Sequence, residues 1–412
     1  MEGGAVLAGG PWQSRRFRWV WGGETLSMVG DASYQIVFVW QVLSVSHSPA
    51  TLAAVLVAAA IPRGVLLLVG GAVVDRFSPR AVMGVVHLVR GAVVTALTIL
   101  AAIEALRVWQ FYLIGIIVGI ADAFFWPASG SIVPTLVEPP ALARANALVG
   151  VGEQVSGFVG PVVGGVLLAS TSAPLALACI AATFLVAAVT VLAAPPTPAD
   201  MDADRYSVSQ LLREVRGGVT YAGRNPETRM VLLLLSAATL SYSGLFAVGL
   251  PALARRFTDG PIVLGVMVSA WGLGQLIGAV CASITGLPVR WGLLIITMTL
   301  VEGVSFAVLG LAPHYLLAAA ILLFLGVGVA YSTDVALPTF IQTSTPPHLL
   351  GRVTSVISLP RVALEPVSLA AMGVLAVIDI RWTFVLAAIP MLLVGVGFLT
   401  SPTARTLSTH PP

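Results

Sequence analysis

Lysine is absent from this chain of 412 residues, in which arginine supplies every permanently cationic side chain. A phosphate-binding P-loop needs a lysine to reach the β- and γ-phosphates, and Schiff-base catalysis needs a lysine amine. The absence therefore excludes both chemistries in their usual form. Any work that the chain does against a concentration gradient must draw on an ion gradient, and not on ATP that the chain itself hydrolyses.

Charge of either sign is scarce. Charged residues make up 9% of the chain and hydrophobic residues 58%. A soluble globular chain holds about 25% charged and about 45–50% apolar residues. A water-soluble protein of this length would need charge to cover its surface. The composition therefore predicts that hydrocarbon is the solvent and that the chain is a multi-pass membrane protein.

The residues of common catalytic and metal sites are few and dispersed. Cys179 and Cys281 both lie within apolar runs and predict no disulfide framework. Neither G-x-S-x-G nor H-E-x-x-H occurs. The histidines lack the spacing of metal ligands: His47, His87, His314, His348 and His410. We therefore expect no metal, no cofactor and no enzymatic activity, with an intramembrane enzyme as the disfavoured alternative.

The formal net charge of +3 invites comparison with nucleic-acid-binding proteins. Such proteins cluster arginine with aromatic residues along a groove. Here the arginines are spread along the ends of apolar runs. We expect no nucleic-acid partner, and the positive balance is better interpreted as a topology signal.

Apolar runs long enough to cross a bilayer recur along the chain. A membrane helix needs about 20 mostly apolar residues. The sequence predicts an all-α membrane protein with twelve transmembrane helices, at roughly 18–45, 50–74, 82–104, 108–131, 146–170, 174–194, 228–253, 262–285, 291–312, 315–338, 353–378 and 382–400. These runs define an N-terminal segment 1–17, a six-helix half 18–194, a linker 195–227, a second half 228–400 and a tail 401–412.

The linker 195–227 is the longest polar stretch. It opens with prolines and turns acidic, and then Val208, Leu211, Leu212, Val215 and Val219 follow helical spacing. This pattern is typical of an amphipathic helix at the membrane interface. A solvated linker without membrane contact is the alternative.

Arginines in the short loops predict the orientation, because cytoplasmic loops carry the excess of positive charge. With the N-terminus inside, fourteen of the 21 arginines fall on the inner side, four on the outer side and three within helices. We therefore expect a protein of the plasma (inner) membrane with both termini in the cytoplasm.

The two halves resemble each other. The stretch from Pro134 to Arg144 is similar to the stretch from Pro338 to Arg352, at an offset of roughly 204 to 208 residues. Each stretch contains a Pro-Pro pair after the fourth helix of its half. A six-plus-six duplication explains this pattern, and such repeats place the binding site at their interface.

Two motifs carry a resemblance to a known family. After the second helix, Gly71, Asp75, Arg76 and Arg80 resemble motif A of the major facilitator superfamily, Gly-x-x-x-Asp-Arg-x-Gly-Arg-Arg. In the fifth helix the chain resembles motif C, the antiporter motif of exporters, at Ser156, Gly160, Pro161, Gly164 and Gly165. Further runs around Phe124–Pro134, Ala145–Leu148 and Val219–Arg229 resemble the macrolide-efflux and siderophore-exporter branch.

The resemblance implies a drug/proton antiporter with two six-helix pseudo-repeats around a central cavity, in which motif A forms the inner gate. The chain departs from the family pattern at motif A, where Ser78 replaces the second Gly and Pro79 replaces one Arg. The fourth helix also lacks the Arg and Gln that many drug/proton antiporters carry. The coupling ion is therefore left open by the resemblance.

Charged residues within the apolar helices are candidates for function, because each costs at least ~2.5 kcal/mol to insert. Glu24, Ser27, Asp31 and Gln35 form one polar stripe in the first helix. Asp31 would lie about 18 Å into the membrane, near its midplane. We expect Asp31, Glu24 and Gln35 to face the cavity and to bind protons or substrate, with structural hydrogen bonding as the alternative.

The resemblance adds Asp122 and Asp334, which hold similar places in the two halves on helices that line the cavity in this fold. Arg361 and Glu365 are four residues apart and predict a structural ion pair within one helix. Arg90 and Glu302 lie on helices that the fold places away from the cavity centre. They are interpreted as structural.

Together these features predict a secondary active exporter that works by alternating access, with proton antiport as the expected coupling. Its partners would be a small-molecule substrate, protons and the lipid bilayer, and we expect a monomer. Uptake, or facilitative transport by the same fold, is the main alternative. The substrate is predicted to be a largely apolar compound, and a drug, another natural product and a siderophore all fit.

Overall fold

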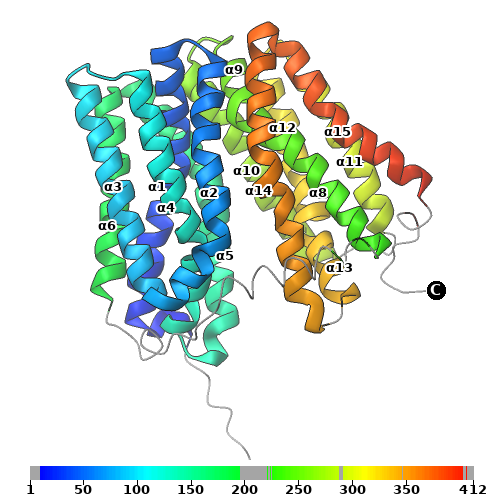
Figure 1. The fold of residues 1–412 in the computed structure, drawn as a ribbon, viewed down its shortest axis with the longest axis horizontal. Coiled ribbons are helices and arrows are strands. Elements are labelled where there is room, and N and C mark those ends of the chain that lie inside the picture. The colour runs from blue at the N-terminus through cyan, green and yellow to red at the C-terminus, as the bar shows by residue number, and fades with distance from the viewer. Residues whose placement is uncertain are drawn as a thin grey trace, which may run out of the picture. The chain divides into compact units, whose positions relative to one another are not determined.

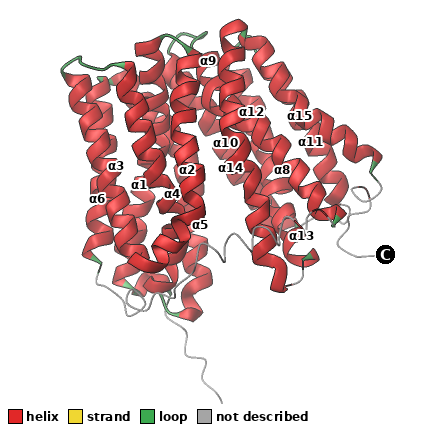
Figure 2. Ribbon diagram, in the orientation of Figure 1, coloured by secondary structure: helices red, strands yellow, loops and turns green. Residues whose placement is uncertain are grey.

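The computed structural model describes residues 10–194, 220, 223, 225–286, 291–345, 347–401 and 405. Within helices, side chains are left undescribed at 68–76, 227, 291, 340, 343–344, 347–352 and 354–355. The described part is helical and contains no strand (Figure 2). The predicted linker 195–227, with its interfacial helix, lies almost entirely outside the described residues.

Long helices account for the first half of the chain. They are α1 (Arg15–Ser46), α2 (Pro49–Phe77), α3 (Pro79–Ala102), α4 (Val108–Leu136), α5 (Leu142–Ser170) and α6 (Ala173–Ala193). Short 3-10 turns precede α1 and α5, at Pro11–Gln13 and Pro139–Ala141. In this half, α3 and α6 run side by side along most of their length (Figure 1).

The second half is more broken. Its α-helices are α8 (Pro226–Gly244), α9 (Leu250–Ala254), α10 (Gly260–Thr285), α11 (Trp291–Leu309), α12 (Tyr315–Val329), α13 (Leu337–Ser344), α14 (Pro347–Ile378) and α15 (Ile380–Thr400). Two π-helical stretches, η4 (Leu245–Gly249) and η5 (Ala330–Ala336), join α8 to α9 and α12 to α13 without a break in the helix. Such widened turns are frequent at functional sites.

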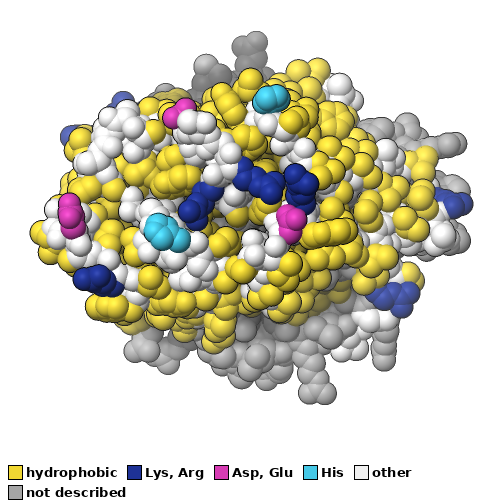
Figure 3. Space-filling view, turned by 90° about the horizontal axis from the view of Figure 1, so that it is seen from above, with side chains coloured by type: hydrophobic (Ala, Val, Ile, Leu, Met, Phe, Trp, Pro, Cys, Tyr) yellow, Lys and Arg dark blue, Asp and Glu magenta, His cyan; other side chains and the backbone are white. Residues whose placement is uncertain are grey.

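Eleven helices in the described part are long and apolar enough to cross a membrane. The twelfth, α1, is 32 residues long and carries Glu24 and Asp31. Hydrophobic side chains cover most of the face seen in Figure 3, and charged side chains there are few. Twelve membrane helices, as predicted, therefore make up the fold.

Contacts divide the chain into two compact units. Unit 1 comprises Met1–Val37 and Pro62–Val208, and unit 2 comprises Phe38–Ile61 and Ser209–Pro412. The end of α1 and the start of α2 belong to unit 2 because they pack on its helices. A Cβ added at Gly260 would lie 2.2 Å from the Trp40 ring, and one at Gly373 would lie 2.2 Å from the Ala53 Cβ.

Candidate functional site

A buried arginine organises the polar side chains of unit 1. Arg90 of α3 is 4% exposed, and its guanidinium bonds the Asp122 carboxylate of α4, with Nε 3.1 Å from Oδ1. The Asp31 carboxylate of α1 lies 4.0 Å from the same guanidinium. Arg63 of α2 lies 4.0 Å from the other Asp122 oxygen. Four helices thus bring two carboxylates and two guanidinium groups together, which we call the Arg90 cluster.

Two aromatic rings also contact Arg90. Its guanidinium carbon lies 4.6 Å from the centroid of Phe125 and 5.7 Å from that of Phe184. Both distances suit a cation–π interaction. Asp31 is the most accessible member of the cluster, with a side chain that is 35% exposed. The cluster therefore has one half-exposed carboxylate beside a fixed positive charge.

The polar stripe of α1 faces two different partners. Asp31 faces Arg90, whereas Glu24 is buried and its Oε1 lies 2.6 Å from Nε2 of the buried His87. Ser27, also buried, donates to the backbone carbonyl of Glu24 at 3.0 Å. Gln35 is exposed and hydrogen-bonds Asp31 one turn away.

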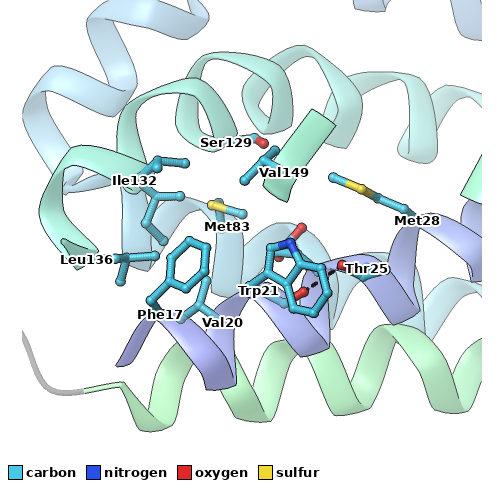
Figure 4. A pocket seen from close by; sticks show the side chains of 12 residues that line it. Phe17, Val20, Trp21, Thr25, Met28, Met83, Ser129, Ile132, Leu136 and Val149 are labelled. Atoms are coloured by element: carbon cyan, nitrogen blue, oxygen red, sulfur yellow. Dashed lines mark hydrogen bonds between the residues drawn. The ribbon is translucent and has the colours of Figure 1, made fainter. Parts of the chain in front are cut away.

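Glu24 also lines a small pocket between α1, α3, α4 and α5, with a cavity volume of about 30 Å³ (Figure 4). The rest of the lining is almost entirely apolar: Phe17, Val20, Trp21, Thr25, Met28, Met83, Ser129, Ile132, Val133, Leu136 and Val149. The second carboxylate oxygen, Oε2, has no hydrogen-bond partner among the described residues. A buried acceptor without a partner is costly, so this oxygen is available to bind a proton donor.

The glycines of motif C place α5 directly against the backbone of α1. A Cβ on Gly160 would lie 2.9 Å from the Val29 carbonyl oxygen, and one on Gly164 would lie 2.7 Å from that of Ser33. Ser33 donates to the Gly160 carbonyl at 2.8 Å. The contact therefore depends on residues without a side chain, as in other close helix pairs in membranes.

The other motif C residues support the same contact. Ser156 donates to the Thr25 carbonyl of α1 at 3.3 Å. Pro161 and Gly165 are buried within α5.

Motif A is only partly described. The side chains of Asp75 and Arg76 are not among those described, and neither are the surroundings of Gly71. Arg80 donates to the carbonyls of Val191, at 3.2 Å, and Leu192, in the last turn of α6. Carbonyls in the last turn of a helix lack their usual intrahelical partners, and a cation there interacts favourably with the negative end of the helix dipole.

Ser78, which replaces a motif A glycine, has φ 62° and ψ 139°, a backbone conformation that favours glycine. Its hydroxyl accepts a hydrogen bond from the Ala81 N–H at 3.3 Å and caps α3. The structure thus gives a reason for glycine at this place in the family motif.

Unit 2 contains a second set of polar contacts. The Tyr242 hydroxyl of α8 donates to the Glu302 carboxylate of α11 at 2.8 Å, and Glu302 is 4% exposed. The Gln275 amide of α10 donates to Asp334 at 3.4 Å, and Asp334 lies within the π-helical η5. Arg361 and Glu365 both lie in α14, and their pairing stays a prediction.

Several of these residues were not among the sequence-based candidates. Arg90, Arg63, His87 and Glu302 each bond a carboxylate or phenol on another helix. In the sequence, such residues can be recognised only as charged or titratable residues within an apolar helix. The sequence could not show which helices are neighbours, so Arg90 and Glu302 were assigned a merely structural role. Within the described residues no group of three or more His, Cys, Asp and Glu could hold a metal ion.

Two bacterial exporters are similar to this chain. The multidrug efflux pump Tap of Mycolicibacterium fortuitum is 27% identical over 391 residues, which cover 92% of this chain and 93% of Tap. The enterobactin exporter EntS of Citrobacter koseri is 25% identical over 315 residues, which cover 74% of this chain and 72% of EntS.

Solved structures share the fold at low identity. The transporter PepTSo aligns with a TM-score of 0.72 and 14% identity, over 94% of this chain and 97% of PepTSo. The nucleoside transporter NupG aligns with a TM-score of 0.66 and 12% identity, over 93% of this chain and 98% of NupG. These likenesses confirm the predicted major facilitator fold.

The profile of one family, described as transmembrane secretion effectors, matches residues 7–408, almost the whole chain. The family and the named relatives are transporters and not enzymes, in agreement with the prediction from the sequence. This chain belongs to the transmembrane secretion effector family of the major facilitator superfamily.

Proposed function

We propose that this chain exports a small, largely apolar compound in exchange for protons. The main support for proton coupling is the Arg90 cluster, in which two carboxylates share a buried guanidinium within otherwise apolar helices. The names of Tap and EntS, an efflux pump and an exporter, support the direction of transport. A drug, a natural product and a siderophore remain the candidate classes of substrate.

Asp31 is the proposed proton carrier of this cluster. Its side chain is 35% exposed and lies 4.0 Å from Arg90, whereas Asp122 is held by a direct hydrogen bond. Protonation of Asp31 would remove its attraction for the guanidinium, and Arg90 would then pair with Asp122 alone. Such a change in pairing gives α1, α3 and α4 two discrete arrangements, which is what alternating access requires.

The test is the variant Asp31→Asn, which mimics the protonated state. Proteoliposomes with an imposed pH gradient would report efflux of two probes, ethidium and chloramphenicol. We expect the gradient-driven movement of any probe that the wild type exports to be lost, while exchange without a gradient survives. Ser27→Ala is the matched control on the same helix. If Asp31→Asn keeps gradient-driven export, the coupling residue lies elsewhere, with Glu24, Asp122 and Asp334 as the next candidates.

We propose that motif A, at Gly71, Asp75, Arg76 and Arg80, forms the inner gate. An Asp75 carboxylate can pair with a helix N-terminus, where the dipole favours negative charge. Asp75→Asn should sharply reduce export while the protein remains in the membrane at wild-type abundance. Wild-type export by this variant would remove Asp75 from the mechanism.

We also propose that the protein resides in the inner membrane as a monomer, with both termini in the cytoplasm. The excess of arginine in the loops on that side supports this orientation. Tags fused at Met1 and at Pro412 should be reachable only from inside. A tag in the loop of Arg255 and Arg256 should be reachable from outside, and an external signal from either terminus would contradict the orientation.

A further inference from the structure

Polar residues occupy matched positions in the two halves of the chain. Three pairs are separated by 212 positions and one by 211: Arg63 and Gln275, Arg90 and Glu302, Asp122 and Asp334, and Asp31 and Tyr242. The contacts are matched as well. Arg63 lies 4.0 Å from Asp122 and Gln275 lies 3.4 Å from Asp334, while Arg90 faces Asp31 and Glu302 bonds Tyr242. Unit 2 thus repeats the Arg90 cluster with different side chains.

The two sets of residues differ in charge. Both arginine positions of unit 1 are occupied in unit 2 by residues without positive charge, Gln275 and Glu302. In the described part of unit 2, neither Glu302 nor Asp334 has an ion-pair partner. A buried carboxylate without a counter-charge is strongly disfavoured within a membrane. The cation that neutralises Glu302 must therefore come from outside the described residues.

The helices around Glu302 offer few ionisable groups. Tyr242 faces it from α8 and Asp334 interacts with it from η5. Helix α10 carries only Cys281 and α12 only Tyr315. Helix α15 carries Arg381, which is exposed in its first turn. Apart from Arg381, and from Arg229 near the start of α8, the ionisable groups on these helices are neutral or negative.

Aromatic packing limits the size of the cation. The Tyr242 ring lies with its centroid 4.7 Å from Phe306, 5.4 Å from Trp271 and 5.7 Å from Phe246. These are distances of rings in direct contact, which leave no space for a ligand between them. Because Glu302 itself is 4% exposed, an organic ammonium group could reach its carboxylate only if neighbouring side chains moved, whereas a proton needs no space.

We propose that Glu302 is a proton-binding carboxyl, the counterpart in unit 2 of the proposed coupling carboxylate in unit 1. This inference rests on the proposed proton antiport and adds a second protonation site to it. The proton adds to Oε1, and the Tyr242 hydroxyl continues to donate to Oε2. Binding converts the carboxylate into a neutral carboxylic acid and removes its repulsion with Asp334.

Infrared difference spectroscopy of the purified protein tests proton binding without any substrate. A protonated carboxyl gives a carbonyl stretching band that a carboxylate lacks. Between about pH 5 and about pH 9, the wild type should gain and lose such bands, and the one that belongs to Glu302 should be absent from Glu302→Gln. Asp334→Asn is the matched control and should keep it. A spectrum in which Glu302→Gln removes no band at any pH would overturn the proposal.

A second variant covers the case in which Glu302→Gln does not fold. Tyr242→Phe keeps the ring and removes only the hydrogen bond to the carboxyl. A carbonyl that accepts fewer hydrogen bonds absorbs at higher wavenumber, so the band should shift upward in this variant. An unshifted band would show that the titrating carboxyl is not the one that Tyr242 contacts.

Transport separates a proton from an organic cation at the same site. Glu302→Gln should lose gradient-driven efflux of the permanent cation ethidium and of neutral chloramphenicol to the same extent. Loss of ethidium efflux alone would assign Glu302 to an organic ammonium group and overturn the proposal. If the wild type exports neither compound, the proposed function fails for these probes, and the infrared result still decides the protonation of Glu302.

Discussion

Glu24 Oε1 of α1 lies 2.6 Å from His87 Nε2 of α3, and both side chains are buried. The remaining polar atoms of the pair, Glu24 Oε2 and His87 Nδ1, have no partner among the described residues. The pair therefore contains one strong hydrogen bond and two unsatisfied atoms. Removal of either residue alone leaves the other side chain without a hydrogen-bond partner among the described residues.

We predict a large and non-additive effect of changes at this pair. His87→Leu should reduce the free energy of unfolding by about 1–3 kcal/mol, because the Glu24 carboxyl is left buried without its partner. Adding Glu24→Leu should restore most of this loss, since no polar group then remains. Thermal unfolding of the purified variants measures both. The exposed His314 provides the control, His314→Leu, with a change within about 0.5 kcal/mol; additive effects of the two pair variants would refute the coupling.

Arg90 should be required for folding as well as for transport. Arg90→Gln leaves Asp31 without its counter-charge and Asp122 with Arg63 alone, at 4.0 Å, and breaking a buried pair in this way costs about 3–5 kcal/mol. We expect a marked fall in the amount of folded protein in the membrane. Asp122→Asn in the same chain removes one of the two carboxylates that Arg90 neutralises and should restore part of that amount.

Quantitative immunoblotting of membranes, with the detergent-extracted monodisperse fraction, measures this rescue. Arg381→Gln changes an exposed arginine on α15 and is the control for loss of positive charge. A double variant that is no more abundant than Arg90→Gln would show that the buried charges are not the cause of the loss.

The hydrophobic runs predicted the helices well because membrane helices satisfy their own backbone and need only length and apolar composition. The predicted span 174–194 corresponds to α6 at Ala173–Ala193, and 382–400 to α15 at Ile380–Thr400. The π-helical stretches η4 and η5 were not predicted. Such widened turns depend on packing and carry no sequence pattern of their own.

The Arg90 cluster could be predicted only in part. Asp31 was selected because a charge within an apolar helix needs a reason, whereas Asp122 was selected because the family resemblance places its helix at the cavity. The identity of the partner depends on which helix faces lie together, which a single sequence does not specify. Arg90 and Glu302 are 212 positions apart in the sequence, as are Asp122 and Asp334. This correspondence can be interpreted only together with the matched contacts in the structure.

Ser78 offers a test of backbone strain. A residue with a Cβ at φ 62° and ψ 139° costs about 1–3 kcal/mol, and glycine costs little there. Glycine as a helix N-cap is worse than serine by only a few tenths of a kcal/mol (~0.3). Ser78→Gly should therefore stabilise the protein by about 1–2 kcal/mol, seen as a higher unfolding temperature. Ser78→Ala keeps the strain, loses the cap and should destabilise; a lower unfolding temperature for Ser78→Gly would show that the strain is absent.

The contact of α5 with α1 provides a matched pair of glycines on one helix. A Cβ added at Gly160 would lie 2.5 Å from the Ala32 Cβ and 2.9 Å from the Val29 carbonyl oxygen, whereas one added at Gly157 would meet nothing within 4 Å. Backbone atoms cannot move aside as a flexible side chain can. Gly160→Ala should therefore separate the two helices.

We expect Gly160→Ala to lower the free energy of unfolding by about 1–3 kcal/mol, the usual cost of overpacking. Its export should fall further than its abundance in the membrane, because α1 carries the proposed proton carrier Asp31 and the contact fixes where that helix lies. Gly157→Ala should leave both quantities near wild type, since alanine is also the better helix former. Measurement of export per folded molecule, for both variants in the same proteoliposomes, separates stability from mechanism. Equal export by the two variants would mean that the close approach of α5 to α1 serves packing alone.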